Sequence, residues 1–135
     1  MYQLDLTALS ETIKDHFPEI PFVFLFGSAK NGIVNEGSDI DIAFWYKGNN
    51  ELIKLDLLRT IEPFAKGIEI DLINLNGANP ILAHEALSGK ILYLRQGAIE
   101  FYATYYTRVA TEYEDRMYWM KKQLEYRNYE VQWSY

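Results

Sequence analysis

The chain has 135 residues, of which 49% are hydrophobic, and this suggests one domain with a single buried core. It contains no cysteine, so disulfides and thiolate metal sites are excluded. The net charge is −6 and no basic stripe is present, which disfavours a long nucleic acid as partner, because such binding depends on Lys and Arg beside phosphates.

The sequence contains no pattern typical of a membrane or secreted protein. No apolar run approaches the roughly 20 residues that a membrane helix needs. The first residues, "MYQLDLTALSETIKDHF", lack the basic and apolar regions of a signal peptide. We therefore expect a soluble cytoplasmic protein.

The first part of the chain predicts one helix and two strands. Helical spacing of apolar residues covers about residues 5–17, and "PFVFLF" at 21–26 has the unbroken apolar character of a buried strand. Residues 38–46 alternate as a second strand, with Asp39 and Asp41 on the same face. The opposite face of that strand holds Ile40, Ile42 and Phe44.

The rest of the chain adds a further strand and three helices. We expect a helix at 48–67, a strand at 68–75 and a short helix capped by Asn79. Residues 90–95 form either a fourth strand or the start of a long helix that runs from Ala98 to about Arg127. The predicted class is α/β or α+β, with a small mixed sheet flanked by helices and a long C-terminal helix. We divide the chain into a core at 1–97 and a helix and tail at 98–135.

Two aspartates one residue apart on an apolar strand are unusual. Asp39 and Asp41 project from the same face, where two uncompensated carboxylates repel each other. A divalent cation removes that cost, and oxygen ligands suit Mg²⁺ or Mn²⁺. Asp71 lies on a later apolar strand; if the two strands are neighbours, three carboxylates converge and are able to hold two ions for displacement at phosphorus.

A Gly-Ser pair precedes these aspartates. Gly27 permits a sharp turn and the close approach of a phosphate, and Ser28 offers a hydroxyl. If a helix begins here, its free N–H groups add to an anion site. Lys30 adds a positive charge.

The spacing of these residues resembles a known family. "GS" at 27–28, ten intervening residues and "DID" at 39–41 are similar to the G-S-x10-D-x-D signature of the DNA polymerase β-like nucleotidyltransferases. The segment "IEIDLINLNGANPILAHEALSGKILYLR" resembles the third-carboxylate strand and following region of the minimal nucleotidyltransferase (MNT) group. The long last helix is similar to that of MntA-like antitoxins, which pair with HEPN-domain toxins.

The resemblance implies specific roles for these residues. Gly27 and Ser28 bind the triphosphate of ATP, and the charge of Lys30 is an additional candidate for this contact. Many relatives have a basic residue directly before the glycine at position 32, where this chain has Asn31, with Lys30 one place earlier. Asp39, Asp41 and Asp71 bind magnesium, and Asp71 accepts the proton of the attacking hydroxyl. The implied reaction moves AMP from ATP to a tyrosine of the HEPN toxin, a ribonuclease, and silences it within a hetero-oligomer.

Two other functions stay open. One is nucleotidyl transfer to a small molecule, as in aminoglycoside nucleotidyltransferases, although their acceptor pocket is formed by a larger second domain. The other is an antitoxin that inhibits by binding alone. Eight of the eleven tyrosines lie between Tyr102 and Tyr135, more aromatic residues than one helix face buries, which favours a partner surface. The aromatic residues outside the apolar stripe are Trp119, Tyr126, Tyr129, Trp133 and Tyr135.

Overall fold

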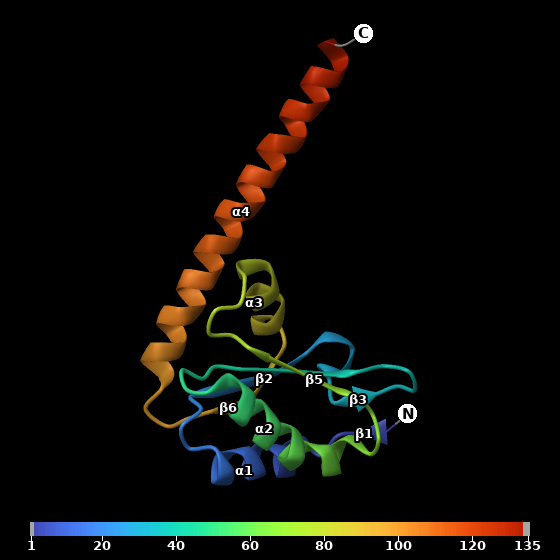
Figure 1. Ribbon diagram of the computed structural model, residues 1–135, viewed down its shortest axis with the longest axis vertical. Coiled ribbons are helices and arrows are strands. Elements are labelled where there is room, and N and C mark those ends of the chain that lie inside the picture. Colours follow the sequence, from blue (N-terminus) through green and yellow to red (C-terminus); the bar gives the residue numbers. More distant parts are fainter. Residues whose placement is uncertain (1, 134–135) are drawn as a thin grey trace.

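A four-stranded sheet with helices on both faces forms the body of the protein (Figure 1). The computed structural model describes residues 2–133, with side chains up to residue 128. The strand order is β5–β4–β2–β6, in which β2 (Phe22–Phe26) is antiparallel to β4 (Ile40–Phe44) and β6 (Lys90–Leu94). β4 is parallel to β5 (Ile70–Asn74). The mixed sheet and its helices confirm the predicted fold class.

Two layers of helices cover the sheet. α1 (Leu6–His16) and α2 (Asn50–Ala65) pack on one face, over the core cluster that contains Ile40 and Ile42. α3 (Pro80–Leu87) and the start of α4 (Ile99–Trp133) pack on the other face (Figure 1). All five residues of β2 are buried, as its unbroken apolar sequence predicts, because both faces of this central strand are covered.

Helix boundaries follow the capping residues. The side chains of Asp5, Asn49 and Asn79 each accept a hydrogen bond from a backbone N–H in the first turn of α1, α2 and α3. The segment at 90–95 is a strand, which decides between the two predicted alternatives. The sequence did not predict the ribbon of β1 (Tyr2–Gln3) and β3 (Ile33–Val34), because two-residue strands have too little periodicity to recognise.

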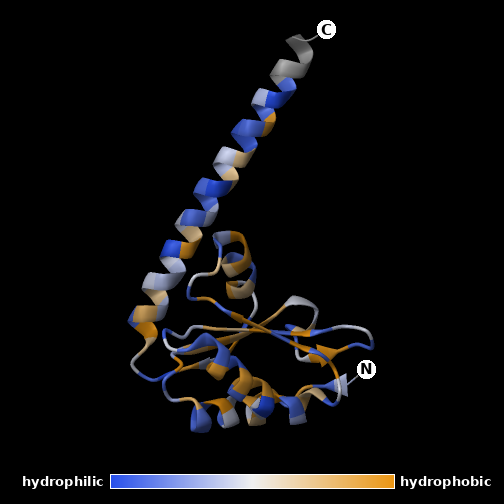
Figure 2. Ribbon diagram, in the orientation of Figure 1, coloured by the Kyte–Doolittle hydropathy of each residue, from blue (hydrophilic) through white to orange (hydrophobic). Residues whose placement is uncertain are grey.

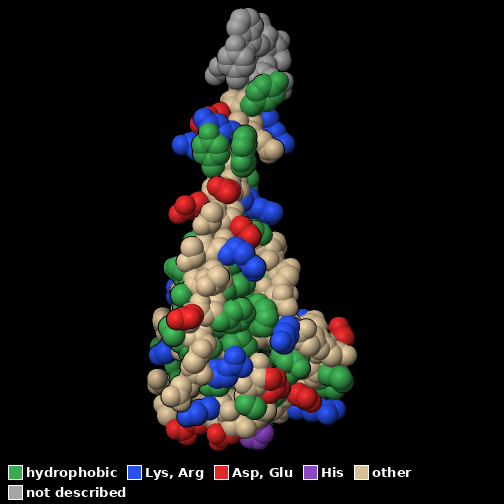
Figure 3. Space-filling view, turned by 90° about the vertical axis from the view of Figure 1, so that its left-hand side faces the viewer, with side chains coloured by type: hydrophobic (Ala, Val, Ile, Leu, Met, Phe, Trp, Pro, Cys, Tyr) green, Lys and Arg blue, Asp and Glu red, His purple; other side chains and the backbone are tan. Residues whose placement is uncertain are grey.

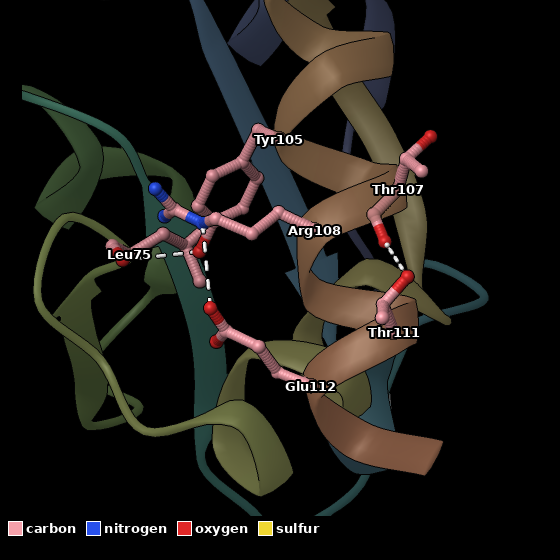
Figure 4. Close-up of polar contacts among 6 residues, drawn as sticks. All are labelled: Leu75, Tyr105, Thr107, Arg108, Thr111 and Glu112. Atoms are coloured by element: carbon pink, nitrogen blue, oxygen red, sulfur yellow. Dashed lines mark hydrogen bonds and ion pairs between the residues drawn. The ribbon is translucent and has the colours of Figure 1, made fainter. Parts of the chain in front are cut away.

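The first part of α4 is anchored to the body by aromatic side chains. The Tyr105 hydroxyl donates to the Leu75 carbonyl at 3.0 Å (Figure 4). His84 of α3 stacks on Tyr113 with ring centroids 3.7 Å apart. Both contacts fix the direction in which α4 leaves the sheet.

Beyond Tyr113, α4 projects away from the body (Figure 1). Its apolar stripe continues, but Met120 and Leu124 are 45% and 57% exposed. Figure 2 shows hydrophobic strands in the body and mixed hydropathy along the projecting helix. No helix of the described residues is apolar over enough of its length to span a bilayer. The aromatic side chains of Tyr129, Trp133 and Tyr135 lie outside the described residues.

Candidate functional site

Asp41 lies near the start of β4, on the sheet face that α3 and α4 cover, and Asp39 directly precedes the strand. Ile40 and Ile42 are fully buried in the opposite core, so the alternation of the strand turns Asp41 the other way. Asp39 comes just before the strand and is exposed, whereas Asp41 is half-buried. The sequence thus predicted correctly the face on which Asp41 lies.

Asp71 is the register partner of Asp41. β4 and β5 are parallel neighbours, and Asp41 and Asp71 lie directly opposite each other. Residues paired in this way project to the same face. The strand adjacency on which the three-carboxylate hypothesis depended is therefore present.

The carboxylates influence one another electrostatically. Burial raises the pKa of Asp41 above its ordinary value, and the negative charges of Asp71, Asp39 and Glu85 raise it further. The ion pairs among the described side chains include none that compensates these groups. The site therefore concentrates negative charge, and a bound cation would reduce the repulsion among these carboxylates.

Glu85 was not identified from the sequence. It lies on α3, is exposed, and raises the pKa of Asp41 through its charge. No spacing rule connects a glutamate in this helix with an aspartate more than forty residues earlier. Only the packing of α3 on β2 brings the two groups near each other.

Gly27 lies against the carboxylate of Asp41. Its φ is +73°, a left-handed conformation that favours glycine, and a methyl group added there would overlap Asp41 Oδ2. Phe26, the preceding residue, is the register partner of Asp41 on β2. The turn and the carboxylate therefore form one continuous surface. Position 27 favours glycine for two reasons: its left-handed backbone conformation and the lack of space for a methyl group.

The segment after Gly27 is a single 3₁₀ turn, Gly27–Ala29, rather than the start of a longer helix. Ser28 is exposed, so its hydroxyl is accessible to a ligand. Lys30 ends the turn, is exposed, and donates its backbone N–H to the Gly27 carbonyl at 3.3 Å. That N–H is thus already used, and only the ammonium group of Lys30 remains for an anion.

The donor set fits a hard divalent cation, although the structure contains no preformed cage. Among the described residues no three His, Cys, Asp or Glu side chains are arranged to enclose one ion. Asp39 and Asp71 are exposed, while Asp41 is half-buried with its carboxylate against Gly27. Mg²⁺ usually takes only one or two protein carboxylates and completes its shell with water and phosphate oxygens. An open cluster of carboxylates suits that requirement.

The family model described as polymerase β nucleotidyltransferase matches residues 8–98. This range includes all six residues that the sequence predicted for the site: Gly27, Ser28, Lys30, Asp39, Asp41 and Asp71.

Individual relatives are also similar to this chain. The protein adenylyltransferase MntA of Shewanella oneidensis is 28% identical over 105 residues, which cover 76% of this chain and 75% of the relative. A toxin–antitoxin complex solved with AMP-PNP contains a chain with a TM-score of 0.69 and 21% identity, covering 90% of this chain and 97% of that one. The solved complex of a tri-AMPylated Shewanella oneidensis HEPN toxin with an MNT antitoxin also contains a similar chain. Its TM-score is 0.62 at 19% identity, and the match covers 89% of this chain and 92% of that one. At these identities the structural likeness establishes the fold.

Proposed function

Because the chain belongs to the polymerase β nucleotidyltransferase family, we propose that it is an antitoxin that acts as a protein adenylyltransferase. It transfers AMP from ATP to a tyrosine of a partner HEPN toxin and so neutralises it. The observation that supports this most is the pairing of Asp41 with Asp71 beside the Gly27 turn. The similar MntA protein is named as a protein adenylyltransferase, and a related toxin was found tri-AMPylated in complex with its MNT antitoxin.

Asp39, Asp41 and Asp71 would hold Mg²⁺, as two ions, with Mn²⁺ as a substitute. Bound there, the metal supplies charge neutralisation at the α-phosphate and at the leaving pyrophosphate. The raised pKa of Asp41 supports this assignment, because a cation favours the ionised carboxylate that its neighbours disfavour.

The protein's own residues position the reactants. The Gly27 turn lets the triphosphate approach the backbone, while the Ser28 hydroxyl and the Lys30 ammonium bind its oxygens. Asp71 accepts the proton of the acceptor hydroxyl. The hydroxyl oxygen then bonds to the α-phosphorus, the bond from the α-phosphorus to the bridging oxygen breaks, and pyrophosphate leaves with that electron pair.

We further propose that residues 1–97 form the catalytic unit and that residues 98–135 serve the partner. The reaction takes place in the cytoplasm, where both ATP and a ribonuclease target would be present. A second candidate, inhibition by binding without catalysis, is supported by the exposed apolar residues of α4. A small-molecule acceptor has no comparable support from the described residues.

One experiment separates these functions. The protein is incubated with ATP labelled at the α-phosphate, Mg²⁺ and its partner HEPN toxin. Label on the toxin supports protein adenylylation, whereas stable binding without label supports inhibition by occlusion. Label on neither protein, with label on an added aminoglycoside, would establish the small-molecule reaction instead.

A further inference from the structure

A partly exposed apolar stripe runs along α4 from the body to the projecting part of the helix. The stripe starts at Tyr106 and continues 7, 11, 14 and 18 residues later with Tyr113, Met117, Met120 and Leu124. Each of these spacings is close to a whole number of helical turns of 3.6 residues, so all five side chains share one face. They span roughly 27 Å at 1.5 Å per residue. We refer to these five residues as the arm stripe.

The arm stripe begins at a groove of the body. Leu87 of α3, Ile91 of β6 and Tyr106 of α4 lie among the residues that line a groove of about 480 Å³. Ile91 and Tyr106 are 42% and 48% exposed, so the groove opens outward. Within the stripe, His84 stacks on Tyr113 and Met117 is half-buried, whereas Met120 and Leu124 are 45% and 57% exposed.

Basic residues border the distal part of the arm stripe on both sides. Arg116, Lys121 and Arg127 each lie three or four residues from Met117, Met120 or Leu124, and therefore next to them on the helix surface. From Arg116 to Asn128 the helix carries four basic residues and one acidic residue, a net charge of +3 in a chain of net charge −6. The turn before it carries Glu112, Glu114 and Asp115, so the basic border belongs to the stripe beyond Met117. Figure 3 shows hydrophobic side chains with Lys and Arg beside them on the projecting helix.

We propose that the arm stripe binds an amphipathic helix of the partner toxin whose apolar face is bordered by Asp and Glu, an inference that rests on the proposed function. A straight stripe of this length matches helix-to-helix recognition through residues three, four and seven apart. Acidic borders on the partner helix complement the basic borders of the stripe. A second copy of this chain aligned in parallel would instead place one +3 segment against another.

The position of the stripe connects docking with the active site. α3 packs against both α4 and β2, and Phe26 at the end of β2 is the register partner of Asp41. A partner held along the stripe therefore lies beside the helix that borders the carboxylates. Docking on the arm stripe would raise the local concentration of the acceptor tyrosine near the aspartates. The site would then need no separate pocket that binds the tyrosine side chain by itself.

Two matched pairs of variants test the proposal. Leu124→Asp is compared with Tyr126→Asp, since both side chains are highly exposed, at 57% and 62%, but Tyr126 lies on the opposite face of α4. Lys121→Glu is compared with Lys122→Glu, since only Lys121 borders the stripe. The dissociation constant for the full-length toxin is measured by calorimetry, and ATP binding serves as the control for folding.

We expect Leu124→Asp to weaken toxin binding by about 10- to 100-fold, and Lys121→Glu by about tenfold and more strongly at low salt. Tyr126→Asp and Lys122→Glu should stay within about twofold of the unmodified protein. AMP transfer by Leu124→Asp should recover at saturating toxin. Equal losses within each pair would overturn the proposal, as would a dimer of this chain that Leu124→Asp dissociates while toxin binding is kept. Toxin binding without AMP transfer by the unmodified protein would instead contradict the proposed function and leave the docking test valid.

Discussion

Asp41 and Asp71 are register partners on two parallel strands, and Gly27 lies against the carboxylate of the first. This arrangement gives the site one half-buried carboxylate, Asp41, and two exposed ones, Asp39 and Asp71. In the proposed metal site Asp41 would set where the cation binds, and the two exposed carboxylates would turn toward it. The site is thus organised around Asp41.

A methyl group at position 27 should displace the Asp41 carboxylate. We expect Gly27→Ala to lose AMP transfer and to lower the free energy of unfolding by about 1–3 kcal/mol, because the left-handed φ is strained for alanine and the methyl overlaps Oδ2. Transfer rates and chemical denaturation measure the two effects.

Gly37→Ala provides the matched control for this change. Gly37 has a similar φ of +79° but no heavy atom within 4 Å of an added methyl. It should lose stability through backbone strain, by about 1 kcal/mol, and keep its transfer activity. If both variants lost transfer equally, strain rather than contact with Asp41 would explain the effect.

The sequence predicted the residues of this site better than their assembly. The spacing of Gly27, Asp39 and Asp41 and the alternation of β4 were sufficient to predict which side chains share a face. The pairing of β4 with β5 was not predictable, because strand neighbours are chosen by packing over the whole sheet. Glu85 and the overlap at Gly27 were missed for the same reason, since both depend on how distant segments pack.

Similar reasoning applies to α4. Its apolar spacing predicted a helix with one continuous face, which the structure confirms. The sequence could not show where α3 stops covering that face, because Tyr113 and Met120 follow the same spacing while only the first is stacked on His84. The extent of the free stripe follows from tertiary packing alone.

The stability of the protein should depend on the ionisation of Asp41. Its pKa is raised in the folded state, mainly by burial, so the folded state holds this proton more tightly than the unfolded chain. The contribution to stability is therefore present below the ordinary aspartate pKa of about 4 and is lost as the pH rises through the higher folded pKa. In metal-free buffer Asp41→Asn should melt at a higher temperature than the unmodified protein at pH 7, and the difference should disappear at low pH. A variant that melts lower at pH 7 would indicate that the carboxylate is stabilised by its surroundings.

Magnesium should reverse the order of the two melting temperatures at pH 7, so that the unmodified protein melts above Asp41→Asn. A ligand at concentration L that binds only the folded state adds a stability of RT ln(1 + L/Kd), which is about 2.7 kcal/mol at a concentration 100 times the dissociation constant, and so raises the melting temperature. We expect Mg²⁺ to raise the melting temperature of the unmodified protein and not that of Asp41→Asn, and EDTA to abolish AMP transfer. Sodium chloride at the same ionic strength controls for screening. An equal shift in both proteins would place the ion away from these carboxylates.

The hydroxyl of Tyr105 should help to hold α4 on the body. Its hydrogen bond to the Leu75 carbonyl is buried, and burial raises the pKa of Tyr105 to about 12 (Figure 4). Tyr105→Phe should cost about 1 kcal/mol at pH 7. The unmodified protein should lose stability as the pH rises from about 10 toward 12, because the unfolded chain releases this proton first, whereas the variant should lose less. Tyr106→Phe, at an exposed neighbouring position, is the control and should change neither value.

Transfer of AMP to the toxin is tested most directly by the mass of the toxin itself. The HEPN toxin is co-expressed with the unmodified protein, with Asp39→Asn or with Asp41→Asn, purified, and analysed intact by mass spectrometry with mapping of the modified residue. Loss of one carboxylate removes several kcal/mol of charge stabilisation, and each 1.4 kcal/mol changes the rate by about tenfold, so transfer should fall by about a thousandfold. We predict a toxin heavier by whole AMP units on tyrosine with the unmodified protein, and an unmodified toxin that still binds both variants. Equal AMP addition by all three proteins would contradict the assignment of the aspartates, and an unmodified toxin in every case would contradict AMP transfer altogether.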